Sequence, residues 1–248
     1  MLDASSISIV LDVLRPERVA LVELLRGLTP DEWARPTECP AYSVQGVATH
    51  VLGDDLSLLS RQRDQAPNGL LLLAGELAGA DFRTLLDTFN DRWVAAARFL
   101  SPALVVTLLE LTGEWTADYY TEVDPSSPGE PVGFFRSSGP SPFWHAIARE
   151  YVERWVHHSQ IRRALGLGSL DDERFVAAGV EVVAAAGGVE PGPGEPWSIG
   201  PVVLGPARQA AAILTRAHNA DEVRGLVTGP PAAVERLALA TGRPEDED

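Results

Sequence analysis

Lysine is absent from this sequence of 248 residues, because all 20 of its basic residues are arginines. A Schiff-base lysine and the lysine of a phosphate-binding P-loop are therefore excluded. Cysteine is nearly absent too: the single Cys39 excludes an internal disulfide framework and a metal cage built from thiolates. Any metal ion in this protein must be held by histidines and carboxylates.

Positive charge is scarce: the 20 basic residues are outnumbered by 35 acidic ones, which gives a formal net charge of -15. Such a surface repels phosphate backbones, and no basic stripe interrupts it, so we expect no nucleic-acid partner. Long apolar runs are missing as well, since stretches such as residues 180–186 are far too short to cross a bilayer. We therefore expect small-molecule partners and no membrane partner.

The amino terminus, MLDASSISIV, has neither a basic segment ahead of an apolar stretch nor a small-residue cleavage pattern. A cytoplasmic location is therefore the expectation. The hydrophobic fraction of 45% and the mean hydropathy of +0.00 are typical of a globular chain. An acidic helical protein of this size is compatible with a monomer or a homodimer.

Helical periodicity dominates the first 186 residues. Apolar residues recur at helical spacing over 15–28, where Pro16 suits the first turn, and an extension back over 7–14 stays open. Ser43 is placed to cap a second helix that ends near residue 63. Further helices are predicted over residues 81–100, 102–120, 142–165 and 171–186. The pair Ser141-Pro142 is expected to open the third of them. These long helices predict a bundle over residues 1–186.

The pattern changes after GGVEPGPGEPW, a Pro/Gly-rich linker at residues 187–197. Beyond it the sequence predicts a strand over 198–204, a helix over 206–218, a strand over 222–227 and a helix over 231–240. We therefore expect a mainly α protein in which residues 187–248 form a small α/β carboxy-terminal domain with an acidic, disordered tail.

Three residues are candidate ligands of one divalent metal ion. Glu153 and His157 are four residues apart, so they project from one face of a helix, where they can share a metal or form an ordinary ion pair. His50 lies in the apolar stretch VATHVLGDDLSLL, where a core imidazole needs a polar partner, and a hydrogen-bonded core histidine is the alternative. Two imidazoles and one carboxylate leave positions open on the ion, as catalytic sites do. Zinc is the first choice, with nickel, manganese and iron as alternatives.

The stretch LLRGLTPDEWARPTECPAYSVQGVATHVLGDD resembles the amino-terminal signature of the mycothiol-dependent maleylpyruvate isomerase family, within the DinB-like superfamily. The similarity lies in the spacing of the leucines and Trp33, in the Cys39-Pro40 turn and in His50 on the helix that follows. A second block, 153–158, is similar to the family's later helix, which supplies a Glu and a His. The resemblance implies a DinB-like up-down helical bundle with His50, Glu153 and His157 as metal ligands.

A third block, LGPA at 204–207 followed by AAILTRAHNADEV, is similar to the carboxy-terminal domain of many members. The resemblance implies that Arg216 binds substrate, while a surface salt bridge is an equal alternative. Two positions depart from the family pattern: Ala41-Tyr42 stands where Gly-Trp is usual, and Gln160 stands where an Asp often follows the paired histidines. The second change removes a carboxylate that would orient a metal-binding imidazole.

The resemblance implies a metal-dependent transferase or isomerase that uses mycothiol or a similar low-molecular-weight thiol. The reaction is either S-transfer to a small electrophile or its cis–trans isomerisation, with Arg216 binding a substrate carboxylate. Cys39 is an alternative nucleophile, although packing in a Pro-flanked turn is the simpler interpretation. Two other functions stay open: a hydrolase in which the same metal activates water, and a non-catalytic metal-binding or small-molecule-binding protein.

Overall fold

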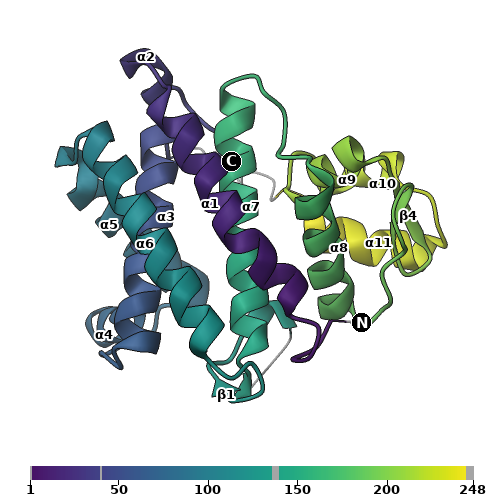
Figure 1. The fold of residues 1–248 in the computed structure, drawn as a ribbon, viewed down its shortest axis with the longest axis horizontal. Helices are drawn as coiled ribbons and strands as arrows, with labels where there is room; N and C mark the ends of the chain where they lie inside the picture. The colour runs from purple at the N-terminus through teal and green to yellow at the C-terminus, as the bar shows by residue number, and fades with distance from the viewer. Residues whose placement is uncertain (1, 40, 136–139, 244–248) are drawn as a thin grey trace. The chain divides into compact units, whose positions relative to one another are not determined.

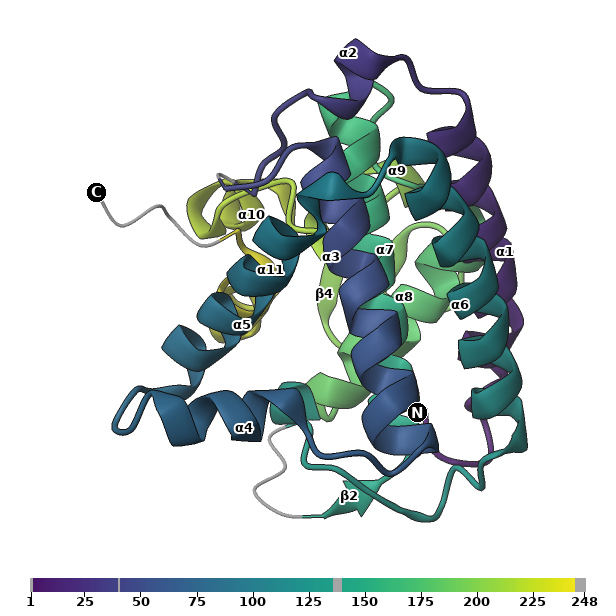
Figure 2. The same cartoon turned by 90° about the vertical axis from the view of Figure 1, so that its left-hand side faces the viewer.

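The structure, a computed structural model, describes residues 2–39, 41–135 and 140–243. The described chain is mainly helical (Figures 1 and 2), which confirms the predicted fold class. It divides into two compact units, one of residues 18–122 and the other of residues 1–17 with 123–248. We call them the 18–122 unit and the 123–248 unit. The boundary at residues 186 and 187 stays a prediction, and the acidic segment 244–248 lies outside the described residues.

The helix α1, Ser8–Arg26, contributes its first half to one unit and its second half to the other. The sequence placed Pro16 in the first turn of a helix, and this prediction is wrong, because Pro16 lies inside α1. A proline there removes one backbone hydrogen bond. Val10, Val13 and Leu14 are buried ahead of it, and this burial supports the helix on its amino-terminal side. The extension back over 7–14 is therefore confirmed from Ser8 onward.

The 18–122 unit is built around one buried helix, α3. Ser43 caps α3 as predicted, since its hydroxyl accepts a hydrogen bond from the backbone N–H of Gly46 at 3.3 Å. Helix α3 packs against both α5 and α6, and most of its residues are buried. The elements of this unit after α1 are α2 (Pro30–Trp33), α3 (Val44–Leu58), the π-helix η1 (Leu59–Arg63), α4 (Gly69–Glu76), α5 (Phe82–Ala96), the 3-10 helix η2 (Ala97–Phe99) and α6 (Pro102–Glu122).

The 123–248 unit is built on the long helix α7, which packs against α8. Trp155 of α7 lies against Gly179 of α8, and Tyr151 donates a hydrogen bond to the carbonyl of Phe175 at 2.7 Å. The elements of this unit after α1 are β1 (Pro128–Gly129), η3 (Gly133–Phe135), β2 (Ser141–Pro142), α7 (Trp144–Ala164), α8 (Glu173–Gly187), β3 (Trp197–Ile199), β4 (Val202–Gly205), α9 (Ala207–Leu214), α10 (Ala220–Leu226) and α11 (Pro231–Thr241).

The pair Ser141-Pro142 does not open a helix, so this prediction is wrong. These two residues form strand β2, which pairs antiparallel with β1, and the Ser141 hydroxyl donates to the Glu130 carbonyl at 2.8 Å. Helix α7 begins two residues later, at Trp144. In a Ser-Pro pair, the proline keeps the serine in an extended conformation, and the serine hydroxyl can bind a nearby backbone group. Both features fit a strand as well as the start of a helix.

Two predicted strands near the carboxy terminus are also corrected. The segment 198–204 is not one strand, because Gly200 turns the chain at a positive φ of 53° and separates β3 from β4, which pair antiparallel. The segment 222–227 is not a strand but part of helix α10. Asn219 and Glu222 form a capping box, in which each side chain accepts the backbone N–H of the other residue, and this local signal starts the helix.

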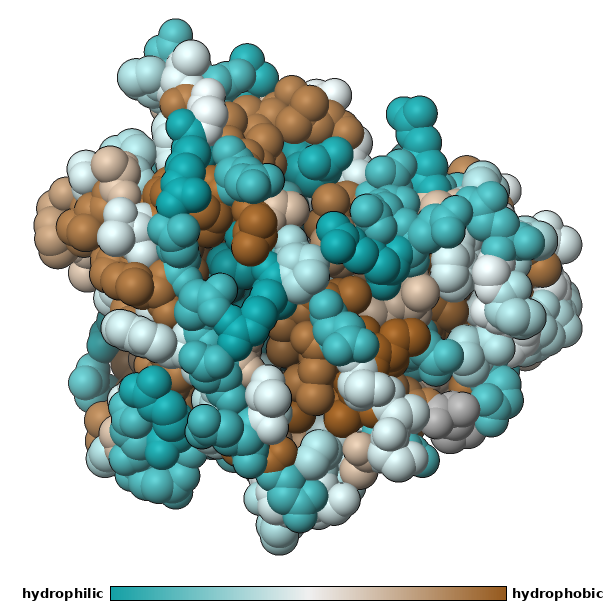
Figure 3. Space-filling model, viewed as in Figure 1, coloured by the Kyte–Doolittle hydropathy of each residue, from teal (hydrophilic) through white to brown (hydrophobic). Residues whose placement is uncertain are grey.

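The surface drawn in Figure 3 mixes hydrophilic and hydrophobic residues. The most exposed large apolar side chains include Leu71 and Leu72 of α4 and Phe82 at the start of α5. Among the described residues, no helix is both long and apolar enough to cross a membrane.

The contact between α3 and α5 can be tested with two helical glycines. A Cβ at Gly53 of α3 would lie 2.3 Å from Nε1 of Trp93, so we expect Gly53→Ala to lower the free energy of unfolding by about 1–3 kcal/mol. Gly75→Ala in α4 is the matched control. Nothing lies within 4 Å of its Cβ position, so we expect it to stabilise by up to about 1 kcal/mol. Urea unfolding measures both, and equal effects would contradict the close α3–α5 packing.

Candidate metal centre

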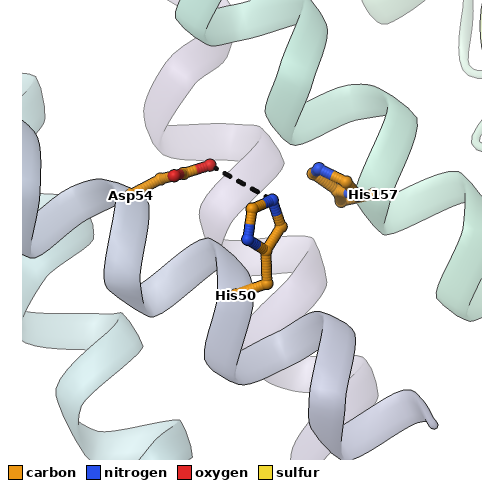
Figure 4. Close-up of side chains that lie close together, drawn as sticks. All are labelled: His50, Asp54 and His157. Atoms are coloured by element: carbon orange, nitrogen blue, oxygen red, sulfur yellow. Dashed lines mark ion pairs between the residues drawn. The ribbon is translucent and has the colours of Figure 1, made fainter. Parts of the chain in front are cut away.

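Helix α3 brings His50 and Asp54 together. They are one helical turn apart, and Nε2 of His50 lies 3.5 Å from Oδ2 of Asp54, as the dashed line in Figure 4 marks. The His50 side chain is 10% exposed and the Asp54 side chain 32%, so the imidazole is largely desolvated while the carboxylate still reaches solvent. Both residues belong to the 18–122 unit.

The orientation of α3 is fixed by a buried ion pair at the next residue, Asp55. Arg18 of α1 donates to both carboxylate oxygens of Asp55, at 2.5 and 3.1 Å, and to the carbonyl of Leu109 at 2.7 Å. Thr112 of α6 adds a third donor to the same carboxylate at 2.6 Å. Asp55 is fully buried and Arg18 nearly so. Both oxygens of the Asp55 carboxylate therefore accept hydrogen bonds from buried groups. Asp54, and not Asp55, is the aspartate that lies beside His50.

Helix α7 carries the other predicted pair in the 123–248 unit. Oε2 of Glu153 lies 3.9 Å from Nε2 of His157, and Nε of Arg149 lies 3.8 Å from Oε1 of Glu153. The Nδ1 atom of His157 lies 2.9 Å from Oε1 of Gln160. With the amide oxygen as acceptor, Nδ1 carries the hydrogen and Nε2 keeps its lone pair for a metal ion. Gln160 thus supplies the oxygen for which the family pattern uses an Asp.

The neighbouring His158 has a different role. It is fully buried, and its Nδ1 lies 2.8 Å from Oε1 of Glu17, which is fully buried too. This contact joins α7 to the first half of α1 inside the 123–248 unit. Adjacent residues on a helix point about 100° apart. When His158 faces the core, His157 is therefore held on another face.

Each unit offers one imidazole and one carboxylate to a metal ion: His50 with Asp54 on α3, and His157 with Glu153 on α7. Around a tetrahedral ion with bonds of about 2.1 Å, neighbouring ligand atoms are about 3.4 Å apart. The 3.5 Å separation within the His50–Asp54 pair fits that edge. Two imidazoles and a carboxylate are also the donors that zinc prefers.

The structure adds one residue to the ligands that the sequence predicted. Asp54 is new and lies beside His50 on α3, and Glu153 lies beside His157 on α7. A signal for Asp54 is present in the sequence, because His50 and Asp54 have the same four-residue spacing that drew attention to Glu153 and His157. The role of Glu153 stays a prediction.

The Ala41-Tyr42 departure places a tyrosine ring beside the site, within the 18–122 unit. The ring of Tyr42 lies 6.0 Å from that of His50, and its hydroxyl donates a hydrogen bond to Asp91 of α5 at 2.7 Å. Burial, and then this hydrogen bond, raise the pKa of Tyr42 well above its usual range. Tyr42 therefore stays protonated at neutral pH, and its uncharged ring lies beside His50.

Arg216 lies in the 123–248 unit at the edge of a cavity of about 350 Å³. The other lining residues are mostly apolar, among them Val152 of α7, Val183 and Leu214. Arg216 is half-buried and has a positive φ of 60°, a left-handed conformation that is strained for arginine. Within the described part of the chain, its guanidinium has no hydrogen-bond or ion-pair partner.

Hydrogen bonds join the turn that carries Arg216 to α7. Arg163 donates to the carbonyl of Thr215 at 3.0 Å and to its hydroxyl at 2.9 Å. Arg163 lies on the same helix as Glu153 and His157. One rigid helix thus carries two of the predicted metal ligands and anchors the residue that precedes Arg216.

The fold and the side chains described define a mainly helical protein with two His–carboxylate pairs, one in each unit. A family model described as the mycothiol maleylpyruvate isomerase N-terminal domain matches residues 14–162. The chain therefore belongs to this family, which confirms the resemblance seen in its sequence. Searches of curated proteins and of solved structures found no match.

Adjacent aspartates provide a matched test of the two roles on α3. We expect Asp55→Asn to lower the free energy of unfolding by about 3–5 kcal/mol, because Arg18 then stays buried without its counter-charge. Asp54→Asn should change stability by less than about 0.5 kcal/mol, since the side chain is partly exposed. Urea unfolding measures both changes. Similar losses in the two variants would contradict this division of roles.

The two carboxylates of the site can be compared by isothermal titration with zinc. We expect Asp54→Asn and Glu153→Gln each to weaken zinc binding by at least about 10-fold, because each removes a charged oxygen next to an imidazole. Glu173→Gln, at an exposed glutamate in the first turn of α8, is the control and should bind zinc as the wild type does. A carboxylate whose removal leaves the affinity unchanged is not a ligand.

Proposed function

We propose that this protein is a metal-dependent enzyme that uses a low-molecular-weight thiol, mycothiol or a close analogue, as its co-substrate. The reaction is S-transfer to a small electrophile or its cis–trans isomerisation. The observation that carries the proposal is the presence of two His–carboxylate pairs, His50 with Asp54 and His157 with Glu153, in a chain of the mycothiol maleylpyruvate isomerase N-terminal domain family. Zinc is the first candidate metal, with nickel, manganese and iron as alternatives.

The residues of the chain fit a site with open positions. His50 and His157 supply nitrogens, and Asp54 or Glu153 supplies an oxygen. A ligand set of three protein groups leaves room for an exchangeable molecule. When bound there, the metal ion lowers the pKa of a coordinated thiol, so that a thiolate is available at neutral pH. The amide oxygen of Gln160 favours the tautomer of His157 in which Nε2 carries the lone pair.

Arg216 is proposed to bind a carboxylate of the electrophilic substrate. Three features support this role: the guanidinium has no partner among the described residues, it borders an apolar cavity, and it is held in a strained conformation. A planar guanidinium binds a carboxylate through two parallel hydrogen bonds, which fixes the orientation of the substrate as well as its position.

Metal and thiol dependence can be tested together. We expect the wild type, purified without added metal, to contain near-stoichiometric metal by elemental analysis, and His50→Ala and His157→Ala to lose it, because each removes a ligand. His158→Asn is the control for an adjacent buried histidine, which should lower stability and leave the ligand set intact.

The assay pairs mycothiol with maleylpyruvate and, separately, with monochlorobimane as a general electrophile. Turnover should fall at least about 100-fold in the metal-free protein and in both ligand variants. It should also vanish when the thiol is omitted. Turnover that survives without thiol would favour the hydrolase, and a metal-loaded protein with no turnover for any thiol–electrophile pair would favour the binding protein.

The role of Arg216 predicts a change in substrate affinity. We expect Arg216→Ala to raise KM for a carboxylate-bearing electrophile by roughly 10- to 100-fold, because a charge-assisted hydrogen bond contributes about 1.5–3 kcal/mol. Arg216→Lys should recover only part of the affinity, since an ammonium lacks the bidentate geometry. Arg208→Ala, at an exposed arginine of α9, is the control. An equal rise in KM for a neutral electrophile would contradict the carboxylate contact.

A further inference from the structure

Helix α6 of the 18–122 unit is apolar on two opposite faces. One face lies in the core of the unit, where Val105 and Leu109 are fully buried. On the outward face, Leu104 and Leu111 are each 43% exposed and Trp115 is 46% exposed. A helix that is apolar all round is normally covered on all sides. The outward face of α6 therefore has the character of a contact surface.

The apolar residues of this outward face follow a heptad spacing. Steps of four, three and four residues separate its members, Leu104, Leu108, Leu111 and Trp115, which we call the α6 stripe. At 3.6 residues per turn, they lie within about 60° of one another around the helix axis. Such a narrow stripe packs against one facing helix, as the helices of a coiled coil do. The α6 stripe is therefore suited to a helical partner.

The α6 stripe is complementary to a second copy of itself. Its spacing is the same when it is read from either end, so an antiparallel copy of α6 matches it residue by residue. In such a pair Leu104 faces the partner subunit's Trp115, and Leu108 faces the partner subunit's Leu111. Every contact of a two-fold symmetric interface occurs twice in this reciprocal way. An indole ring then packs against a leucine at both ends of the contact.

The charges of α6 favour the antiparallel orientation. Glu114, Asp118 and Glu122 lie in its carboxy-terminal half, and its first turn carries no acidic residue. The amino end of a helix has a partial positive charge and the carboxy end a partial negative charge. Acidic residues near the carboxy end are therefore unfavourable within a single α6. In an antiparallel pair they lie beside the amino end of the partner helix, where a negative charge is stabilised.

The carboxylate nearest the middle of α6 has a counter-charge in its own chain. Glu110 lies close to the two-fold axis of the antiparallel pair, so it approaches its own symmetry mate there. Its Oε2 accepts a hydrogen bond from Arg26 of α1 at 2.5 Å. Each copy thus brings an ion pair to the axis, and not a bare carboxylate. The net charge of -15 does not oppose association at this contact.

The area of the exposed apolar surface sets the expected affinity. A stable dimer buries about 800 Å² on each partner, and clearly smaller contacts are weak and transient. The α6 stripe covers about three helical turns, and its partly exposed side chains supply roughly half of that area. Phe99, which is 83% exposed and lies three residues before α6, adds apolar surface at the amino end. We therefore expect a reversible dimer with a Kd in the micromolar range.

We propose that α6 is an interface between two copies of this chain, in which the two α6 stripes pack antiparallel about a two-fold axis. The inference rests on side chains of the 18–122 unit alone. It does not depend on the metal ion, the thiol or the reaction proposed above.

Sedimentation equilibrium of the full chain from about 1 to about 300 μM covers the expected range of affinity. The weight-average mass should rise with concentration from that of one chain towards that of two. We expect Leu111→Glu to weaken association at least about 10-fold, because it places a charge in the middle of the stripe. Leu239→Glu is the matched control, since Leu239 is 67% exposed on α11, outside the stripe, and should leave association unchanged. Circular dichroism verifies that both variants are folded.

Disulfide trapping in a Cys39→Ser background tests the orientation. An oxidised mixture of Leu104→Cys and Trp115→Cys chains should give a mixed disulfide dimer, because these positions face each other in the antiparallel pair. Each variant oxidised alone should give little dimer. Efficient self-disulfides would indicate a parallel pair and overturn the proposal. A chain that stays monomeric at every concentration, or a dimer that Leu111→Glu leaves intact, would overturn it as well.

Discussion

The buried ion pair between Arg18 and Asp55 fixes the rotation of α3 about its axis, and the α3 half of the candidate site depends on that rotation. The carboxylate takes two hydrogen bonds from the guanidinium and a third from Thr112, so α3 is tied to α1 and to α6 at one residue. Two charges removed from water cannot be separated without a loss of several kcal/mol. A glycine at position 113 provides the space for the Arg18 side chain. The face of α3 that carries His50 is set by the same contact.

Two pairs of adjacent identical residues each combine a structural residue with a candidate ligand. In Asp54-Asp55 and in His157-His158, one residue is buried in an ion pair of the core and its neighbour is left for the candidate site. Neighbours on a helix point about 100° apart, so fixing the buried member also fixes the direction of the other. The ligands are thus held by pairs that do not themselves need a metal ion. This arrangement separates the stability of each unit from the chemistry of the site.

The sequence predicted the local structure correctly where a motif is compatible with only one conformation. The cap at Ser43 and the helical spacing of Glu153 and His157 are of this kind. The Ser141-Pro142 pair has two meanings, and only its pairing with β1 decides between them. Asp54 has the four-residue spacing from His50, but the spacing alone does not show that the adjacent Asp55 is held by Arg18, which is far away in the chain. Tertiary contacts of this type cannot be read from spacing alone.

Each half of the candidate site consists of an imidazole with a carboxylate one helical turn away. Without a metal ion, either half is an ordinary His–carboxylate pair on a stable helix, so the fold does not need the ion. In small metal-dependent domains, by contrast, the free energy of binding the ion drives folding, and protein groups occupy every coordination position. A site whose ligands are already held in place by Asp55 and His158 can bind the ion with fewer protein groups. Positions then stay open for an exchangeable ligand, which is what thiol-dependent chemistry requires.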